Sequence, residues 1–140
     1  MASIRKEIHT RAKPDEVWSA LRDVGALHTR LVPGFVVDTK LDGDARIVTF
    51  GNGMTVREPI LEVNDVTKRV AWAAVGGSLT HYNASAQVLP QSDGSSAVVW
   101  IADLLPDEAA PAIEQMMAQG AAVMKETLDR LAAPVGSEHR

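Results

Sequence analysis

Apolar and polar residues alternate most clearly between Thr80 and Leu89. The even-numbered residues from Tyr82 to Val88 are tyrosine, alanine, alanine and valine, and the odd-numbered residues from His81 to Gln87 are polar. Because successive side chains of a strand point to opposite faces, this pattern predicts a strand with one covered face and one solvent-facing side. The alanines on the covered face leave space opposite them.

The rest of the central region divides into further short strands separated by turn residues. Asp42-Gly43-Asp44, Gly51-Asn52-Gly53 and Gly76-Gly77 each interrupt an apolar run, and an Asn-Gly pair is a strong hairpin signal. Together with a first strand at 3–9, we expect strands at 35–41, 45–50, 54–63, 69–75, 79–89 and 97–105. Strands joined by such short turns predict an antiparallel sheet.

Three segments have helical periodicity instead. Pro14 opens a first short helix, and a second short helix or turn covers about 26–31 before Pro33-Gly34 ends it. The long helix runs from Pro111 to Ala133, and it is the only long apolar helix available to cover the sheet. The residues of this helix expected to face the sheet are Ile113, Met116 or Met117, Gly120, Met124, Thr127 or Leu128, and Leu131.

The strand at 54–63 contains a proline, which cannot donate a hydrogen bond to a neighbouring strand. A bulge at Pro59 would change which residues face inward on either side of it. With such a bulge, Glu58 points inward and Arg57 outward, and Leu61 and Val63 also face inward.

Composition limits the classes of function. The chain has 140 residues, no cysteine and a net charge of −4, with 46% hydrophobic and 23% charged residues. We therefore expect one globular domain at 1–133 followed by a flexible tail at 134–140, without disulfides. The negative charge argues against nucleic acid as a partner. No signal peptide or membrane-spanning run is recognised, so we expect a cytoplasmic monomer or homodimer.

The order of these elements and several local motifs resemble the START/Bet v 1-like superfamily (SRPBCC), within its polyketide cyclase/dehydrase and lipid-transport branch. The similarity covers about 3–132. The segments that carry it are PDEVWSALRDVGALH (14–28), PGF (33–35), TVREPILEVND (55–65), RVAWAAV (69–75), HYNASAQVLP (81–90) and SAVVWIADLLP (96–106). The chain departs from the family at His81, where relatives often carry an acidic residue before the tyrosine.

The resemblance implies an α+β helix-grip fold. In this fold a seven-stranded antiparallel sheet wraps around a long C-terminal helix, and two short helices follow the first strand. A cavity opens between the sheet and the long helix. Small residues and methionines on that helix suit an adaptable apolar lining, although methionines also fill irregular gaps in ordinary cores. The ligand-binding candidates are Phe35, Val56, Trp72, Tyr82, Ala84, Trp100, Met116, Met117, Gly120 and Met124.

Two polar residues are candidates for chemistry. Glu58 matches a glutamate frequent in the family, and an inward carboxyl would act as an acid, a base or an anchor for a ligand hydroxyl. Its alternative role is a structural ion pair with a neighbouring arginine. Tyr82 lies on the covered face and either contacts a ligand or forms a structural hydrogen bond, for which Glu58 is a candidate partner. His81 is expected to face outward. For Asp103, a position on the cavity and a position on the surface are both compatible with the sequence.

No metal-ligand spacing, nucleophilic triad or phosphate-binding loop is present in the sequence, so no cofactor is expected. Two functions remain. The first is a carrier or sensor that binds a small hydrophobic molecule such as a lipid, polyketide or isoprenoid. The second is an enzyme resembling polyketide cyclases, aromatases or dehydratases, with Glu58 and Tyr82 as tentative acid/base groups and no metal or nucleotide cofactor.

Overall fold

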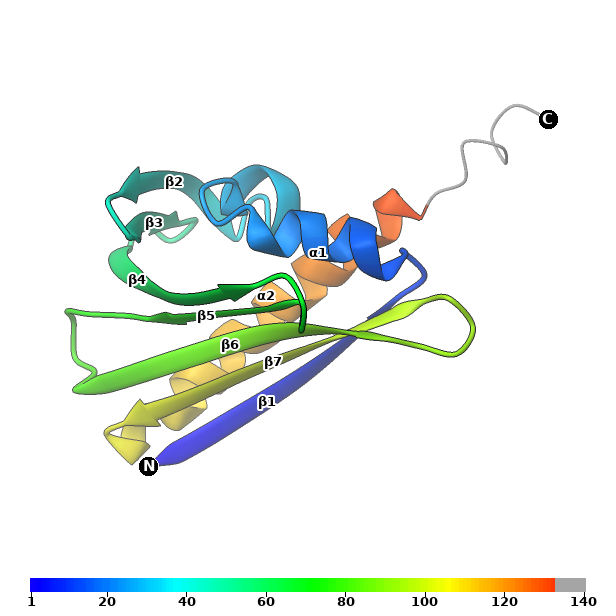
Figure 1. The fold of residues 1–140 in the computed structure, drawn as a ribbon. Coiled ribbons are helices and arrows are strands. Elements are labelled where there is room, and N and C mark those ends of the chain that lie inside the picture. The colour runs from blue at the N-terminus through cyan, green and yellow to red at the C-terminus, as the bar shows by residue number, and fades with distance from the viewer. Residues whose placement is uncertain (133–140) are drawn as a thin grey trace.

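The computed structural model describes residues 1–132 (Figure 1). The predicted seven strands, two short helices and long last helix are confirmed, and a short turn of helix, η2, precedes the last one. The elements are β1 (Ala2–Thr10), α1 (Pro14–Arg22), η1 (Leu27–Leu31), β2 (Val36–Asp42), β3 (Ala45–Phe50), β4 (Thr55–Asn64), β5 (Arg69–Ala73), β6 (His81–Pro90), β7 (Ser96–Leu105), η2 (Asp107–Ala109) and α2 (Ala110–Leu131). The predicted boundary at 133 and the tail at 134–140 lie outside the described residues.

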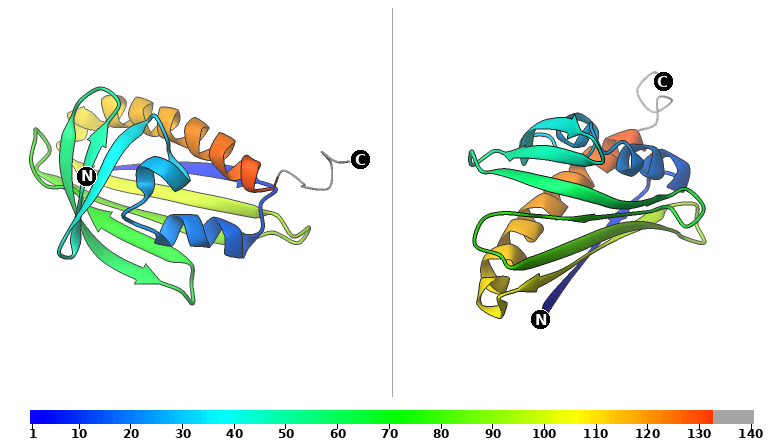
Figure 2. Two further views of the ribbon diagram at one scale, coloured as in Figure 1. Left: turned by 90° about the horizontal axis from the view of Figure 1, so that it is seen from above. Right: turned by 60° about the vertical axis from the view of Figure 1, so that its left-hand side comes forward.

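All seven strands form one antiparallel sheet in the order β1-β7-β6-β5-β4-β3-β2. Each strand from β2 to β6 pairs with the next along the chain, as short turns require. β1 is the exception, because it pairs with β7 at the far end of the sequence. The sheet curves strongly, and α2 runs along its concave side (Figure 2).

The helices cover the two ends of the concave face differently. α1 and η1 lie near the end of α2, while the start of α2 lies near the end of β7 (Figure 1). Pro14 at the first position of α1 and acidic residues in its first turn favour helix initiation there. Trp18 anchors α1, because its indole Nε1 donates to Asp65 Oδ1 at 2.9 Å just after β4.

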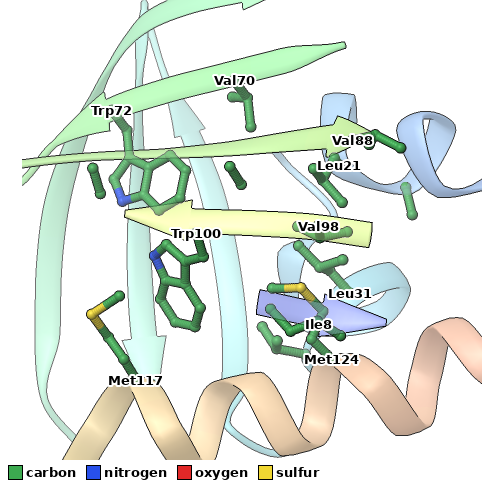
Figure 3. Close-up of a cluster of buried hydrophobic side chains, with 14 of the residues drawn as sticks. Ile8, Leu21, Leu31, Val70, Trp72, Val88, Val98, Trp100, Met117 and Met124 are labelled. Atoms are coloured by element: carbon green, nitrogen blue, oxygen red, sulfur yellow. The ribbon is translucent and has the colours of Figure 1, made fainter. Parts of the chain in front are cut away.

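The core between sheet and helix contains residues from nearly every element (Figure 3). Met117, Gly120, Met124 and Leu128 are the buried residues of α2. Leu131, expected to face the sheet, is instead 40% exposed. It is the last residue of α2, where the helix has no further turn to hold it against the sheet.

β4 changes partner along its length. Thr55 to Pro59 pair with β3, and Ile60 to Asn64 pair with β5. The predicted bulge is present, but the register shifts between Ile60 and Glu62 rather than at Pro59. Glu58 is buried and Arg57 exposed, as predicted.

The placement of Leu61 and Val63 corrects the sequence interpretation. Leu61 is 54% exposed because it is the extra residue of the bulge. Val63 pairs with the buried Val70, so the two residues share a face of the sheet, yet Val63 remains 38% exposed near the end of the strand.

Candidate functional site

A cavity of about 320 Å³ lies between the concave face of the sheet and α2. The segment at 74–79, between β5 and β6, also contributes to its wall. The lining is mainly aliphatic and aromatic, and it consists of Leu21, Leu27, Leu31, Val32, Phe35, Val36, Arg46, Phe50, Met54, Thr55, Val56, Glu58, Val70, Trp72, Ala74, Val75, Gly76, Gly77, Ser78, Leu79, Tyr82, Ala86, Trp100, Ala109, Ala112, Ile113, Met116 and Met124.

Most of the residues singled out from the sequence lie on this wall. They come from β4 to β7, from the residue before β2 and from α2, so folding brings together positions far apart in the chain. Those that line the cavity are Phe35, Val56, Glu58, Trp72, Tyr82, Trp100, Met116 and Met124.

Ala84, Met117 and Gly120 are buried but do not line the cavity. Gly120 was expected to leave space beneath the helix. Instead, α2 approaches the sheet so closely there that a Cβ on Gly120 would lie 3.0 Å from Phe35 and 3.0 Å from Trp100. Figure 3 shows Met117 beside Trp100 in the packed part of this interface. These residues therefore contribute to the packed core outside the cavity.

Arg46 is a cavity residue that the sequence interpretation did not name. It lies on β3 directly opposite Glu58 on β4. Both side chains are almost fully buried, and Arg46 Nε donates to Glu58 Oε1 at 2.8 Å. The arginine expected as an alternative partner of Glu58 is thus Arg46.

Further contacts fix the Arg46 side chain. Its Nη1 donates to the carbonyl oxygen of Val24 at 3.3 Å, and its guanidinium lies 5.1 Å from the ring centroid of Trp72. A cation over an indole face is attracted by the ring, more strongly where water is excluded. Backbone, aromatic ring and carboxylate together hold the guanidinium against the cavity wall.

Burial changes the acid–base properties of the carboxyl group in this pair. Loss of solvation raises the pKa of Glu58 above its ordinary value of 4.5, and the charge and hydrogen bond of Arg46 limit that rise. The side chain is therefore a desolvated carboxyl held by one fixed cation.

Tyr82 also lines the cavity and is 7% exposed. Burial, followed by the nearby negative charge of Glu58, raises the pKa of its hydroxyl, which stays protonated. Among the hydrogen bonds of residues 1–132, none joins Tyr82 to Glu58, so the partner suggested by the sequence is not used.

Trp100 carries a further polar atom near the cavity. Its indole Nε1 is buried and has no hydrogen-bond partner among the described residues. A buried donor without a partner is unusual in folded proteins and commonly marks a functional or strained position.

His81 and Asp103 are half-buried and do not line the cavity. Within residues 1–132, no group of His, Asp and Glu side chains is arranged to hold a metal ion. The same part of the chain has no helix with both the length and the apolar character to cross a bilayer. What the site offers is an apolar space with an ion pair and a phenol on its wall.

A curved antiparallel sheet around a long helix, with a lined space between them, defines the START/Bet v 1-like class of folds. The sequence matches, over residues 1–136, the family described as polyketide cyclase / dehydrase and lipid transport. The chain belongs to this family.

Solved structures show the same fold at low sequence identity. XoxI from Bacillus cereus is 19% identical with a TM-score of 0.84, covering 96% of this chain and 100% of that one. Norcoclaurine synthase from Thalictrum flavum is 19% identical with a TM-score of 0.72, covering 94% and 86%.

The di-domain ARO/CYC protein BexL is 15% identical with a TM-score of 0.80, and the match covers 96% of this chain but 48% of BexL. No curated protein matches the sequence. At these identities the structural neighbours show the fold alone.

Proposed function

We propose that the protein binds a small hydrophobic molecule, of lipid, polyketide or isoprenoid type, in the cavity between sheet and α2, as a carrier or sensor. The observation that carries this proposal is the cavity itself, about 320 Å³ in volume and lined mainly by apolar side chains. Ligand pockets generally begin at about 300 Å³. The family and the fold are consistent with this use.

The size of the cavity limits the ligand. An apolar cavity of about 150 Å³ is enough for benzene, so this one has room for about two fused rings or a short branched chain. Burying about 200 Å² of apolar ligand surface contributes about 5 kcal/mol. Because association itself costs about 4 kcal/mol or more, polar contacts on the wall decide whether such a ligand binds tightly.

Native mass spectrometry of freshly purified protein is the direct test for a resident ligand. Thermal unfolding with naphthalene-sized compounds then measures binding. A ligand at 100 times its Kd stabilises the folded state by about 2.7 kcal/mol, which corresponds to about 8 °C at the usual 3 °C per kcal/mol. A broad panel that leaves Tm unchanged, together with no co-purified molecule, contradicts the proposal.

A matched pair of variants locates the binding site. Ala112 lines the cavity and Ala118 does not, and both are exposed on α2. Ala112→Trp places a large side chain at the cavity and is expected to weaken ligand binding at least tenfold. Ala118→Trp adds the same side chain to the same helix and is expected to leave binding unchanged. Equal effects of the two substitutions would place the ligand elsewhere.

The second candidate is an enzyme of the cyclase, aromatase or dehydratase type. It is favoured by the presence on one apolar wall of Glu58 and Tyr82, whose hydroxyl is not engaged with Glu58. Glu58 would transfer a proton to or from the ligand and Tyr82 would donate a hydrogen bond to it. In that case Glu58→Gln and Tyr82→Phe each abolish turnover while naphthalene still binds. Turnover that survives both substitutions removes these groups from the chemistry.

We also propose a cytoplasmic location, no nucleic-acid partner and a monomeric or homodimeric state. The net charge of −4 supports the second point, since phosphate binding needs a basic surface. Light scattering after gel filtration measures the oligomeric state, and a mass above that of a dimer contradicts the expectation.

A further inference from the structure

The charges on the cavity wall balance each other. Among the lining residues, Arg46 and Glu58 are the only ones with charged side chains. They are 4% and 6% exposed, and they form an ion pair at 2.8 Å. A ligand that enters the cavity therefore meets one cation and one anion that already neutralise each other.

The hydrogen-bonding capacity of the pair is not fully used. Arg46 is engaged by Glu58 Oε1, by the Val24 carbonyl and by the face of Trp72. Glu58 Oε2, by contrast, accepts no hydrogen bond from any residue in 1–132. Among these residues Trp100 Nε1 is the one fully enclosed polar side-chain atom without a partner, so Glu58 Oε2 is open to the space beside it. A carboxylate oxygen can only accept a hydrogen bond. Its matching group on a ligand is therefore a hydrogen-bond donor such as a hydroxyl.

We propose that this cavity selects neutral ligands that carry a hydroxyl donor and discriminates against organic anions, with Glu58 as the residue that determines this specificity. The inference rests on the proposed binding function and adds the class of ligand. The ligand hydroxyl donates to Glu58 Oε2, while the apolar part of the ligand contacts the aromatic and aliphatic wall.

An anionic head group is disfavoured for two reasons. A carboxylate or phosphate loses its hydration on entering an apolar cavity, and only a free cation at short range repays that loss. Arg46 is already paired, and Glu58 repels the incoming charge. Fatty acids and phospholipids are thus poorer ligands than neutral molecules of the same size.

The same reasoning predicts how the selectivity can be reversed. Glu58→Gln keeps the size of the side chain but removes the negative charge, which leaves Arg46 as an unpaired cation on the wall. A carboxylate ligand then takes the place of the missing Glu58 charge. The variant is expected to gain affinity for anions and to lose part of its affinity for hydroxyl ligands.

Three probes with the same ring system test the inference by calorimetry at neutral pH: naphthalene, 2-naphthol and 2-naphthoate. For the wild type we expect 2-naphthol to bind most tightly and 2-naphthoate at least tenfold more weakly than 2-naphthol. For Glu58→Gln we expect 2-naphthoate to gain at least tenfold and 2-naphthol to approach naphthalene.

Glu62→Gln is the matched control, because Glu62 lies on the same strand but is exposed and paired with Arg69 at 2.6 Å. It removes the same charge outside the cavity and is expected to leave the order of the three probes unchanged. A Glu62→Gln variant that gains 2-naphthoate affinity as Glu58→Gln does would assign the effect to net charge and overturn the inference.

The possible failures are distinguishable. If naphthalene binds and 2-naphthoate binds the wild type as tightly as 2-naphthol, the charge selectivity is overturned while the proposed binding function stands. If none of the probes binds, the binding function fails and the selectivity with it. Should Glu58→Gln not fold, the ranking of the three probes on the wild type alone decides the matter.

Discussion

Replacing Gly120 with alanine tests the packing between α2 and the cavity wall. The added Cβ would lie 3.0 Å from the Phe35 ring, and 3.0 and 3.1 Å from two ring carbons of Trp100. These distances are shorter than ordinary van der Waals contact, so the rings or the helix must move. Both rings line the cavity, and the empty space beside them is the direction in which they can yield.

Two opposing effects set the change in stability. Alanine inside a helix is favoured over glycine by about 1 kcal/mol, whereas overpacking a tight contact costs about 1–3 kcal/mol. Because the rings can shift toward the cavity, we expect a cost near the low end and a free energy of unfolding within about 1 kcal/mol of the wild type. The larger effect falls on ligand affinity, since the shift narrows the cavity.

Urea unfolding and calorimetry with 2-naphthol measure the two quantities on the same protein. The expected result is a nearly unchanged free energy of unfolding together with affinity reduced severalfold. An increase in stability by the full 1 kcal/mol of helix propensity, with unchanged affinity, would show that the Cβ fits without moving either ring. The helix would then lie farther from the two rings than the 3.0 Å distances indicate.

Three further predictions concern the buried polar groups. Arg46→Met alone lowers the free energy of unfolding by about 3–5 kcal/mol because it leaves Glu58 unpaired, and the double variant Arg46→Met/Glu58→Leu recovers most of that loss; equal losses in urea titrations would contradict this. Since burial raises the pKa of Glu58 above 4.5, the folded state holds its proton more tightly, and the wild type loses stability relative to Glu58→Gln as the pH rises from about 4.5 through the raised pKa; a relative gain would refute the direction. Ser96→Ala removes the 2.8 Å hydrogen bond to the buried Ala12 carbonyl and lowers stability by about 1–2 kcal/mol, whereas the exposed Ser92→Ala has little effect on the urea midpoint.

The architecture could be predicted because its signals are local. Turn residues such as Asn52 and Gly53 separate the strands, and the alternation from His81 to Val88 sets one face of β6 without reference to the rest of the chain. The bulge in β4 was predicted from Pro59 but lies at Leu61, since the exact position depends on how β4 divides its pairing between β3 and β5.

The ion pair could have been found from the sequence. Arg46 and Glu58 are equally distant from Asn52, the centre of the predicted hairpin, so an ideal register places them opposite each other, as the structure does. The function of Gly120 was not accessible in this way. A glycine on a helix fits both an open cavity and a close approach, and only the position of Trp100 distinguishes them.

The contribution of the 74–79 segment to the cavity wall was not predicted either. The sequence placed Val75 and Leu79 at the ends of the strands expected at 69–75 and 79–89. In the structure β5 ends at Ala73 and β6 begins at His81, so both residues belong to the connection between the strands and line the cavity.

The pairing of β1 with β7 has a consequence for how the protein is made. β1 forms its whole ladder with a strand whose last residue is Leu105, so during translation it has no partner until β7 has left the ribosome. Native contacts so distant in sequence slow folding. The nascent chain therefore carries β1 unpaired through most of its synthesis. The seven-stranded sheet is completed only late, when the last part of the chain is made.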